Sequence, residues 1–139
     1  MTASVVLKKY PVRTLPGNHP GIFNTKTYRG IKAVERVGFM VFGQNESNLP
    51  VRHLQVGFNL KIDDNSMDDS PICAIDICRD HRRVAQRALI NRKDFIKAGQ
   101  WQTFVLDFTP EIAKTIYEFR IFYIGYALLM CDFIWLIEL

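Results

Sequence analysis

The chain has 139 residues and a formal net charge of +4, with 48% hydrophobic and 23% charged residues. This composition is ordinary for a globular protein and excludes a wholly disordered chain. The length fits one domain, which at this size buries about two-thirds of the surface that its unfolded chain exposes.

The sequence predicts a reducing, cytoplasmic location without membrane contact. The three cysteines, Cys73, Cys78 and Cys131, leave one over in any single-disulfide scheme and are expected to be small core residues. The first apolar run has four residues, too few for a signal-peptide core. The apolar C-terminal segment contains Asp132 and is well short of the roughly 20 residues of a membrane helix.

Residues 1–30 are rich in Pro, Gly, Asn and Thr, which predicts an extended N-terminal arm leading into a single domain over residues 31–139. The first strand is expected within 33–42. The segment 53–62 then alternates, with Leu54, Val56, Phe58, Leu60 and Ile62 on one side and His53, Gln55, Gly57, Asn59 and Lys61 on the other. That pattern is typical of a half-buried antiparallel strand.

An acidic turn over 63–71 separates this strand from a hairpin predicted at 72–79 and 83–90. A connector with one helical turn follows at 92–99. Three runs of apolar, aromatic and β-branched residues then close the chain, separated by Thr109-Pro110 and by Gly125. Seven or eight strands without a helical period predict an all-β antiparallel sandwich of the jelly-roll type.

Three short patterns in the second half of the chain suggest a family. They are Gly99, Trp101, Phe104, Leu106 and Phe108; Glu118, Phe119, Arg120 and Ile121; and Asp132, Ile134 and Leu136. Over about residues 52–139 the chain resembles the carbohydrate-binding-module class of jelly-roll sandwiches. The resemblance implies a lectin-like module that binds a carbohydrate without catalysis and accompanies carbohydrate-active enzymes.

The predicted ligand-binding residues present polar groups on two strands. His53, Gln55, Asn59 and Lys61 form a row of donors and acceptors, with Glu118 and Arg120 as polar support. The alternative for the row is an ordinary solvated sheet face, and for the charged pair a cross-strand ion pair. Sugar sites also use aromatic platforms. Trp101, Trp135, Tyr123 and Tyr126 are candidates, although the apolar surroundings of the tryptophans favour core packing.

Calcium is the one candidate cofactor. The acidic segment 63–69 is rich in oxygen ligands but lacks the spacing of an EF-hand loop, so a solvated turn is favoured. Asp132 is a tentative metal ligand because its closing-strand position matches a calcium ligand in modules that the chain resembles. The favoured alternative is a carboxylate bonded to backbone or to an arginine.

The sequence does not predict an enzyme, because it contains no nucleophile elbow, zinc-protease helix or phosphate-binding loop. The basic cluster within 79–93 is expected to be a solvated loop. It lacks the interleaved aromatic residues of single-strand binders, which does not favour nucleic acid. The second functional hypothesis is an interaction module or homo-oligomer subunit whose N-terminal arm clasps a neighbour.

Overall fold

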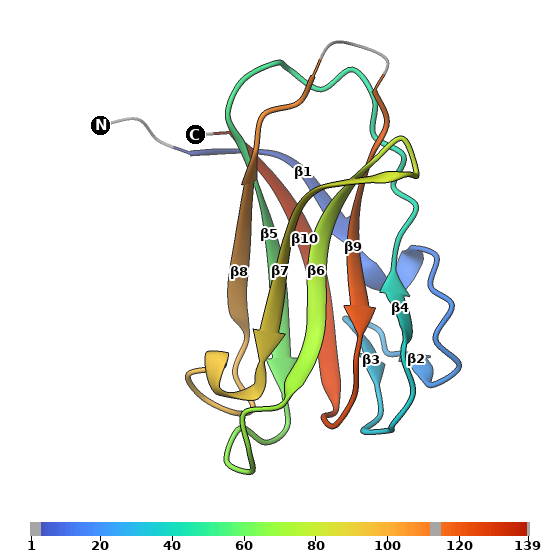
Figure 1. The fold of residues 1–139 in the computed structure, drawn as a ribbon, viewed down its shortest axis with the longest axis vertical. Coiled ribbons are helices and arrows are strands. Elements are labelled where there is room, and N and C mark those ends of the chain that lie inside the picture. Colours follow the sequence, from blue (N-terminus) through green and yellow to red (C-terminus); the bar gives the residue numbers. More distant parts are fainter. Residues whose placement is uncertain (1–3, 112–114, 139) are drawn as a thin grey trace.

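A computed structural model of the protein describes residues 4–111 and 115–138 (Figure 1). The ends of the predicted arm and C-terminal run (residues 1–3 and 139) and residues 112–114, between the first two C-terminal runs, lie outside the described residues. The described elements are β1 (Val5–Pro11), η1 (Val12–Thr14), β2 (Ile22–Asn24), β3 (Arg29–Ile31), β4 (Gly38–Val41), β5 (Leu54–Ile62), β6 (Pro71–Arg79), β7 (Arg83–Asn91), η2 (Arg92–Asp94), β8 (Gln102–Phe108), β9 (Tyr117–Tyr123) and β10 (Leu129–Glu138).

The strands form two antiparallel sheets packed as a sandwich. The six-stranded sheet has the order β2-β3-β10-β5-β8, with β1 also paired to β10, and the four-stranded sheet has the order β4-β9-β6-β7. Figure 1 shows β6 and β7 crossing in front of β10 and β5 as the second layer of the sandwich. This architecture confirms the predicted antiparallel jelly-roll sandwich, with ten strands in the described residues instead of seven or eight.

The additional strands come from the N-terminal segment. β1 pairs with residues 133–138 of β10, while β3 pairs with residues 129–131 of the same strand and β2 pairs with β3. Residues 5–31 therefore extend the six-stranded sheet, which differs from the extended arm expected from their composition. Strands of three residues are too short to show an alternating pattern.

A buried arginine holds this segment in place. The side chain of Arg29 is 5% exposed. Its guanidinium donates to the backbone carbonyls of Leu15 at 2.7 Å and Met40 at 2.9 Å, and to the Oδ1 of Asn24 at 2.9 Å. The η1–β2 connection, β2 and β4 are thus joined through one side chain.

The core lies between the inward faces of the two sheets. The alternation predicted for β5 is confirmed, since all five of its apolar residues, Leu54, Val56, Phe58, Leu60 and Ile62, are fully buried. On β9 the inward residues are Tyr117, Phe119, Ile121 and Tyr123. Gln55, Asn59 and Lys61 therefore point away from the core, onto the outer face of the six-stranded sheet. Among the described residues no helix has the length and apolar character needed to cross a membrane.

The three thiols are all free and buried. Burial raises the pKa of Cys73, Cys78 and Cys131, because a thiolate is poorly solvated in apolar surroundings. We expect the native protein to resist an aromatic disulfide reagent at mildly alkaline pH, and all three thiols to react once guanidinium unfolds the chain. Spectrophotometric thiol counting checks this, and rapid reaction of one thiol in the native protein would contradict it.

Candidate ligand-binding face

The outer face of the six-stranded sheet carries aromatic side chains from several of its strands. We call the surface formed by Phe23, Tyr28, Trp101, Phe133 and Trp135 the aromatic face. Phe133 and Trp135 lie on β10 with ring centroids 5.9 Å apart. Tyr28, just before β3, contacts Trp101, just before β8, at 6.0 Å. Trp101 is 37% exposed, so ring surface is open to solvent.

The polar row of β5 lies beside these rings. Asn59 donates from Nδ2 to Asp132 Oδ1 at 2.8 Å, and its own Oδ1 accepts from the Thr103 hydroxyl at 3.1 Å. These three residues come from β5, β10 and β8, which are neighbours in the sheet. The result is a cross-strand line of amide, carboxylate and hydroxyl groups at the solvent surface.

A second polar group lies at the other end of β5. The side chains of His53 and Gln55 both contact Asp107 Oδ1 at 2.8 Å. Hydrogen bonds from Gln55 and His53 lower the pKa of Asp107, because they stabilise its ionised form. The structure therefore brings His53, Gln55, Asn59 and Lys61 to one outer face, as the sequence predicted.

Gly57 lies between these two polar groups. A Cβ at this position would lie 3.1 Å from Thr103 Cγ2 and 3.9 Å from Trp135 Cβ. A side chain at position 57 would therefore crowd Thr103, whose hydroxyl belongs to the polar line.

Two lysines lie over the aromatic rings. Lys9 Nζ is 3.9 Å from the Phe133 centroid and 4.6 Å from that of Trp135. Lys61 Nζ is 4.6 Å from the Trp101 centroid. Both contacts are within the range of cation–π attraction. The sequence did not predict a role for Lys9. Lys9 lies in β1, and the composition of residues 1–30 had predicted an extended arm there.

A pocket opens between the rings. Its volume is about 250 Å³, and its walls include the rings of Trp101 and Phe133, the cations Arg13 and Lys26, and the carboxylate of Asp132. Pockets that enclose drug-sized ligands have volumes of about 300–1,000 Å³. This pocket is therefore smaller than one that encloses a whole drug-sized ligand.

The predicted aromatic platforms divide into two groups. Trp101 and Trp135 were expected in the core but lie on the outer face, with Trp101 at the same strand parity as Thr103 and Asp107. The shared parity with Thr103 and Asp107 indicated that Trp101 points outward, but the apolar neighbours of Trp101 favoured a core position. Tyr123 is buried and donates to the carbonyl of Ala127 at 2.7 Å, while Tyr126 lies exposed in the turn before β10.

Glu118 and Arg120 lie elsewhere, on the outer face of the four-stranded sheet. Arg120 donates to both oxygens of Asp76, at 2.8 and 2.9 Å, and this pairing raises the pKa of Arg120. Glu118 accepts from the backbone N–H of Gly43 at 2.7 Å and contacts His81 Nδ1 at 2.5 Å. The structure therefore does not bring these two residues to the row on β5, and the six predicted residues occupy two surfaces.

The tentative metal ligand Asp132 accepts hydrogen bonds from Asn59 and from the backbone N–H of Phe133 at 2.7 Å. In the acidic segment, Asp64 and Asp68 accept from Ser66 and Ser70, which closes two tight turns. Among residues 4–111 and 115–138, no three His, Cys, Asp or Glu side chains come together as metal ligands. The metal role of Asp132 stays a prediction.

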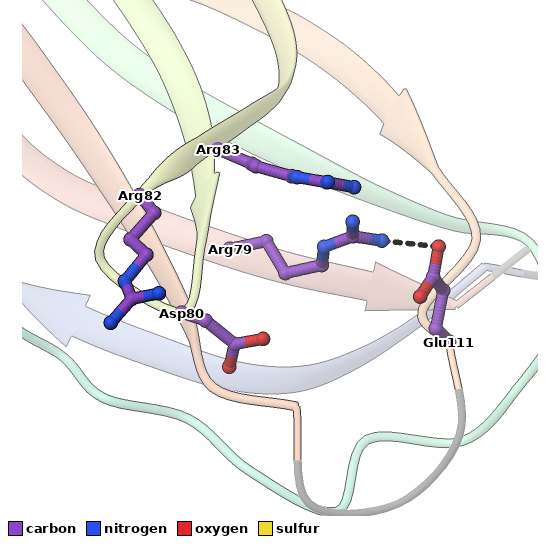
Figure 2. Close-up of a pocket in the computed structure, with 5 residues that line it drawn as sticks. All are labelled: Arg79, Asp80, Arg82, Arg83 and Glu111. Atoms are coloured by element: carbon purple, nitrogen blue, oxygen red, sulfur yellow. Dashed lines mark ion pairs between the residues drawn. The ribbon is translucent and has the colours of Figure 1, made fainter.

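The basic cluster forms a separate pocket at the turn between β6 and β7. Figure 2 shows Arg79 extended towards Glu111, with which it forms an ion pair, and Arg83 alongside it, whereas Arg82 turns away. With Asp80, these residues line a space of about 390 Å³. The described lining of this space contains no aromatic ring.

No protein-family model and no curated protein matches the sequence. Solved structures do match. A carbohydrate-binding module from Cellvibrio mixtus lichenase 5A (CBM6cm-2), solved in complex with cellotriose, aligns with a TM-score of 0.64 at 8% identity, over 97% of this chain and 99% of that one. A CBM4 structure aligns with a TM-score of 0.54 at 15% identity, over 84% of this chain and 74% of that one.

The chain has a carbohydrate-binding-module-like fold. At these identities the similarity establishes the fold alone. Because the alignment with the Cellvibrio mixtus module covers 97% of the chain, it takes in N-terminal strands as well as the segment that carries the sequence resemblance.

Proposed function

We propose that this protein is a non-catalytic carbohydrate-binding module and that it binds its glycan on the aromatic face. The observation that carries the proposal is the exposed ring of Trp101 beside the polar line of Asn59, Asp132 and Thr103. A sugar ring has apolar C–H surfaces and polar hydroxyl edges. An aromatic platform next to hydrogen-bonding side chains complements both.

The arrangement along β5 indicates the shape of the ligand. From His53 to Lys61 the strand extends about 26 Å at 3.3 Å per residue. Polar groups occur near both ends of this length, at Asp107 with Gln55 and at Asp132 with Asn59. The face therefore suits an extended oligosaccharide whose hydroxyls meet successive polar groups, while one unit enters the pocket beside Trp101.

A Trp101→Ala variant tests the proposal. We expect its affinity for a glycan to fall by at least about tenfold, or about 1.4 kcal/mol, because the variant lacks the stacking surface. A broad glycan array first identifies the ligand, with and without chelator, and isothermal titration then measures affinity. Loss of the array signal in chelator would support the calcium prediction for Asp132.

The matched control is Phe122→Ala, which removes a half-buried ring from the outer face of the opposite sheet. This variant is expected to bind as the wild type does. Unchanged affinity in Trp101→Ala together with loss in Phe122→Ala would place the site on the four-stranded sheet. A blank array and no binding in solution would overturn the proposed function itself.

A further inference from the structure

We propose that the aromatic face selects anionic glycans, those bearing carboxylate or sulfate groups, and that Lys9 and Lys61 recognise this charge. The inference rests on the proposed function, because it assumes that the face binds a glycan. Its starting point is the position of the two ammonium groups, each directly over an aromatic ring of the platform.

Both ammonium groups are available to a ligand. Neither has a carboxylate oxygen within 4.0 Å among the described residues, and the same holds for Arg13 and Lys26 at the adjoining pocket. Lys8, the neighbour of Lys9 on the other side of β1, is by contrast paired with Glu46 at 3.3 Å. Cations with no carboxylate partner in the described chain are free to pair with an anion from solution.

The carboxylates of the face do not cancel these cations. Asp132 is the one acidic residue that lines the pocket, and Arg13 and Lys26 line it with Asp132. Its Oδ1 is already taken by the Asn59 amide and a backbone N–H. Asp107, the next carboxylate on this face, lies at the far end of β5, where it is bonded to His53 and Gln55. The part of the face around Trp101 and Phe133 is thus positive.

The lysines also affect how a neutral sugar would bind. An ammonium 3.9 Å above the Phe133 ring covers the surface on which a sugar would stack, so a neutral ligand must displace it and lose the cation–π contact. An anionic ligand instead accepts a charge-assisted hydrogen bond from the same ammonium as it approaches the ring. The same residues therefore oppose neutral sugars and attract acidic ones.

The experiment compares pairs of ligands that share a sugar backbone and differ in whether that backbone carries charged groups. Isothermal titration measures the binding of polygalacturonate and its fully methyl-esterified form, and of dextran sulfate and dextran. We expect the wild type to prefer the anionic member of at least one pair by about tenfold or more, with a preference that declines as salt is added. The pair that shows the preference identifies carboxylate or sulfate as the recognised group.

The variant Lys9→Gln/Lys61→Gln is expected to lose most of this preference, because it weakens the anionic complex and binds neutral glycans more tightly. The matched control is Arg82→Gln/Arg83→Gln, which removes the same charge at the β6–β7 turn (Figure 2). That turn lies at the opposite end of the sandwich from the Lys61 end of β5 (Figure 1). The control should retain the preference.

The outcomes separate the two proposals. Equal binding of charged and neutral glycans by the wild type, with both lost in Trp101→Ala, would overturn the anionic selectivity and leave the binding face intact. An equal loss in both double variants would overturn the role of Lys9 and Lys61, since net charge would then suffice. Failure of every glycan to bind would overturn both proposals.

Discussion

Replacing Arg29 by methionine should lower the free energy of unfolding by about 3 kcal/mol, because it leaves buried carbonyl groups without donors. The guanidinium makes three hydrogen bonds of 2.9 Å or less, to Leu15, Asn24 and Met40. Methionine is of similar length and apolar, so packing is largely kept while each carbonyl loses its partner. Urea unfolding followed by tryptophan fluorescence measures the change.

The same variant should weaken glycan binding, because Arg29 fixes the β2–β3 hairpin that carries Phe23 and Tyr28. Arg29→Lys is the control, since it retains the charge and can satisfy part of the same set of carbonyls. We expect it to fall between the wild type and Arg29→Met. A free energy of unfolding for Arg29→Met within about 0.5 kcal/mol of the wild-type value would be typical of a surface substitution. That result would show that the hydrogen bonds of Arg29 do not hold this segment.

Removal of Asp76 is the second change with a large expected effect. The carboxylate is 6% exposed and forms a two-point contact with Arg120 at the centre of the four-stranded sheet. Asp76→Ala leaves the guanidinium of Arg120 without its counterion and should cost about 3 kcal/mol of stability. Chemical denaturation of Asp76→Ala, Arg120→Ala and the double variant gives the coupling between them.

We expect the double variant to be less destabilised than the sum of the single variants, because it removes both charges together. In Arg120→Ala, the glycan affinity should stay within about twofold of the wild type, which is a change in binding free energy of less than about 0.5 kcal/mol. The reason is that Arg120 lies on the sheet opposite the aromatic face. A large loss of affinity in a folded Arg120→Ala protein would instead assign the ligand to that sheet and support the role first predicted for Arg120.

Long alternating or apolar strands made most of the fold predictable. The sequence pattern located β5, the β6–β7 hairpin and the three C-terminal strands, since each has at least seven residues and contributes to the core. It did not locate β1, β2 or β3. β1 has seven residues, but five of them are exposed, so it adds little to the core. β2 and β3 have three residues each, and tertiary pairing with a neighbouring strand, not local propensity, makes them strands.

The candidate site was predictable on one strand but not across strands. Alternation correctly directed Gln55, Asn59 and Lys61 outward. It also directed Glu118 and Arg120 outward, but a sandwich has two outer faces and the pattern of one strand does not tell which it belongs to. The sequence predicted Trp135 in the core, which is wrong. Its neighbours on both faces of β10 are apolar, so β10 lacks the alternation of polar and apolar residues that shows which side faces outward.

The pairing of β10 also sets an order of events during synthesis. β10 is the last described strand, yet it pairs with β1, β3 and β5, which are made much earlier. Until β10 is available, β1 and the β2–β3 hairpin have no partner in the sheet. The edges of β1 and β3 therefore stay unpaired by β10 while residues 32–128 are made, and this sheet closes only when its central strand arrives.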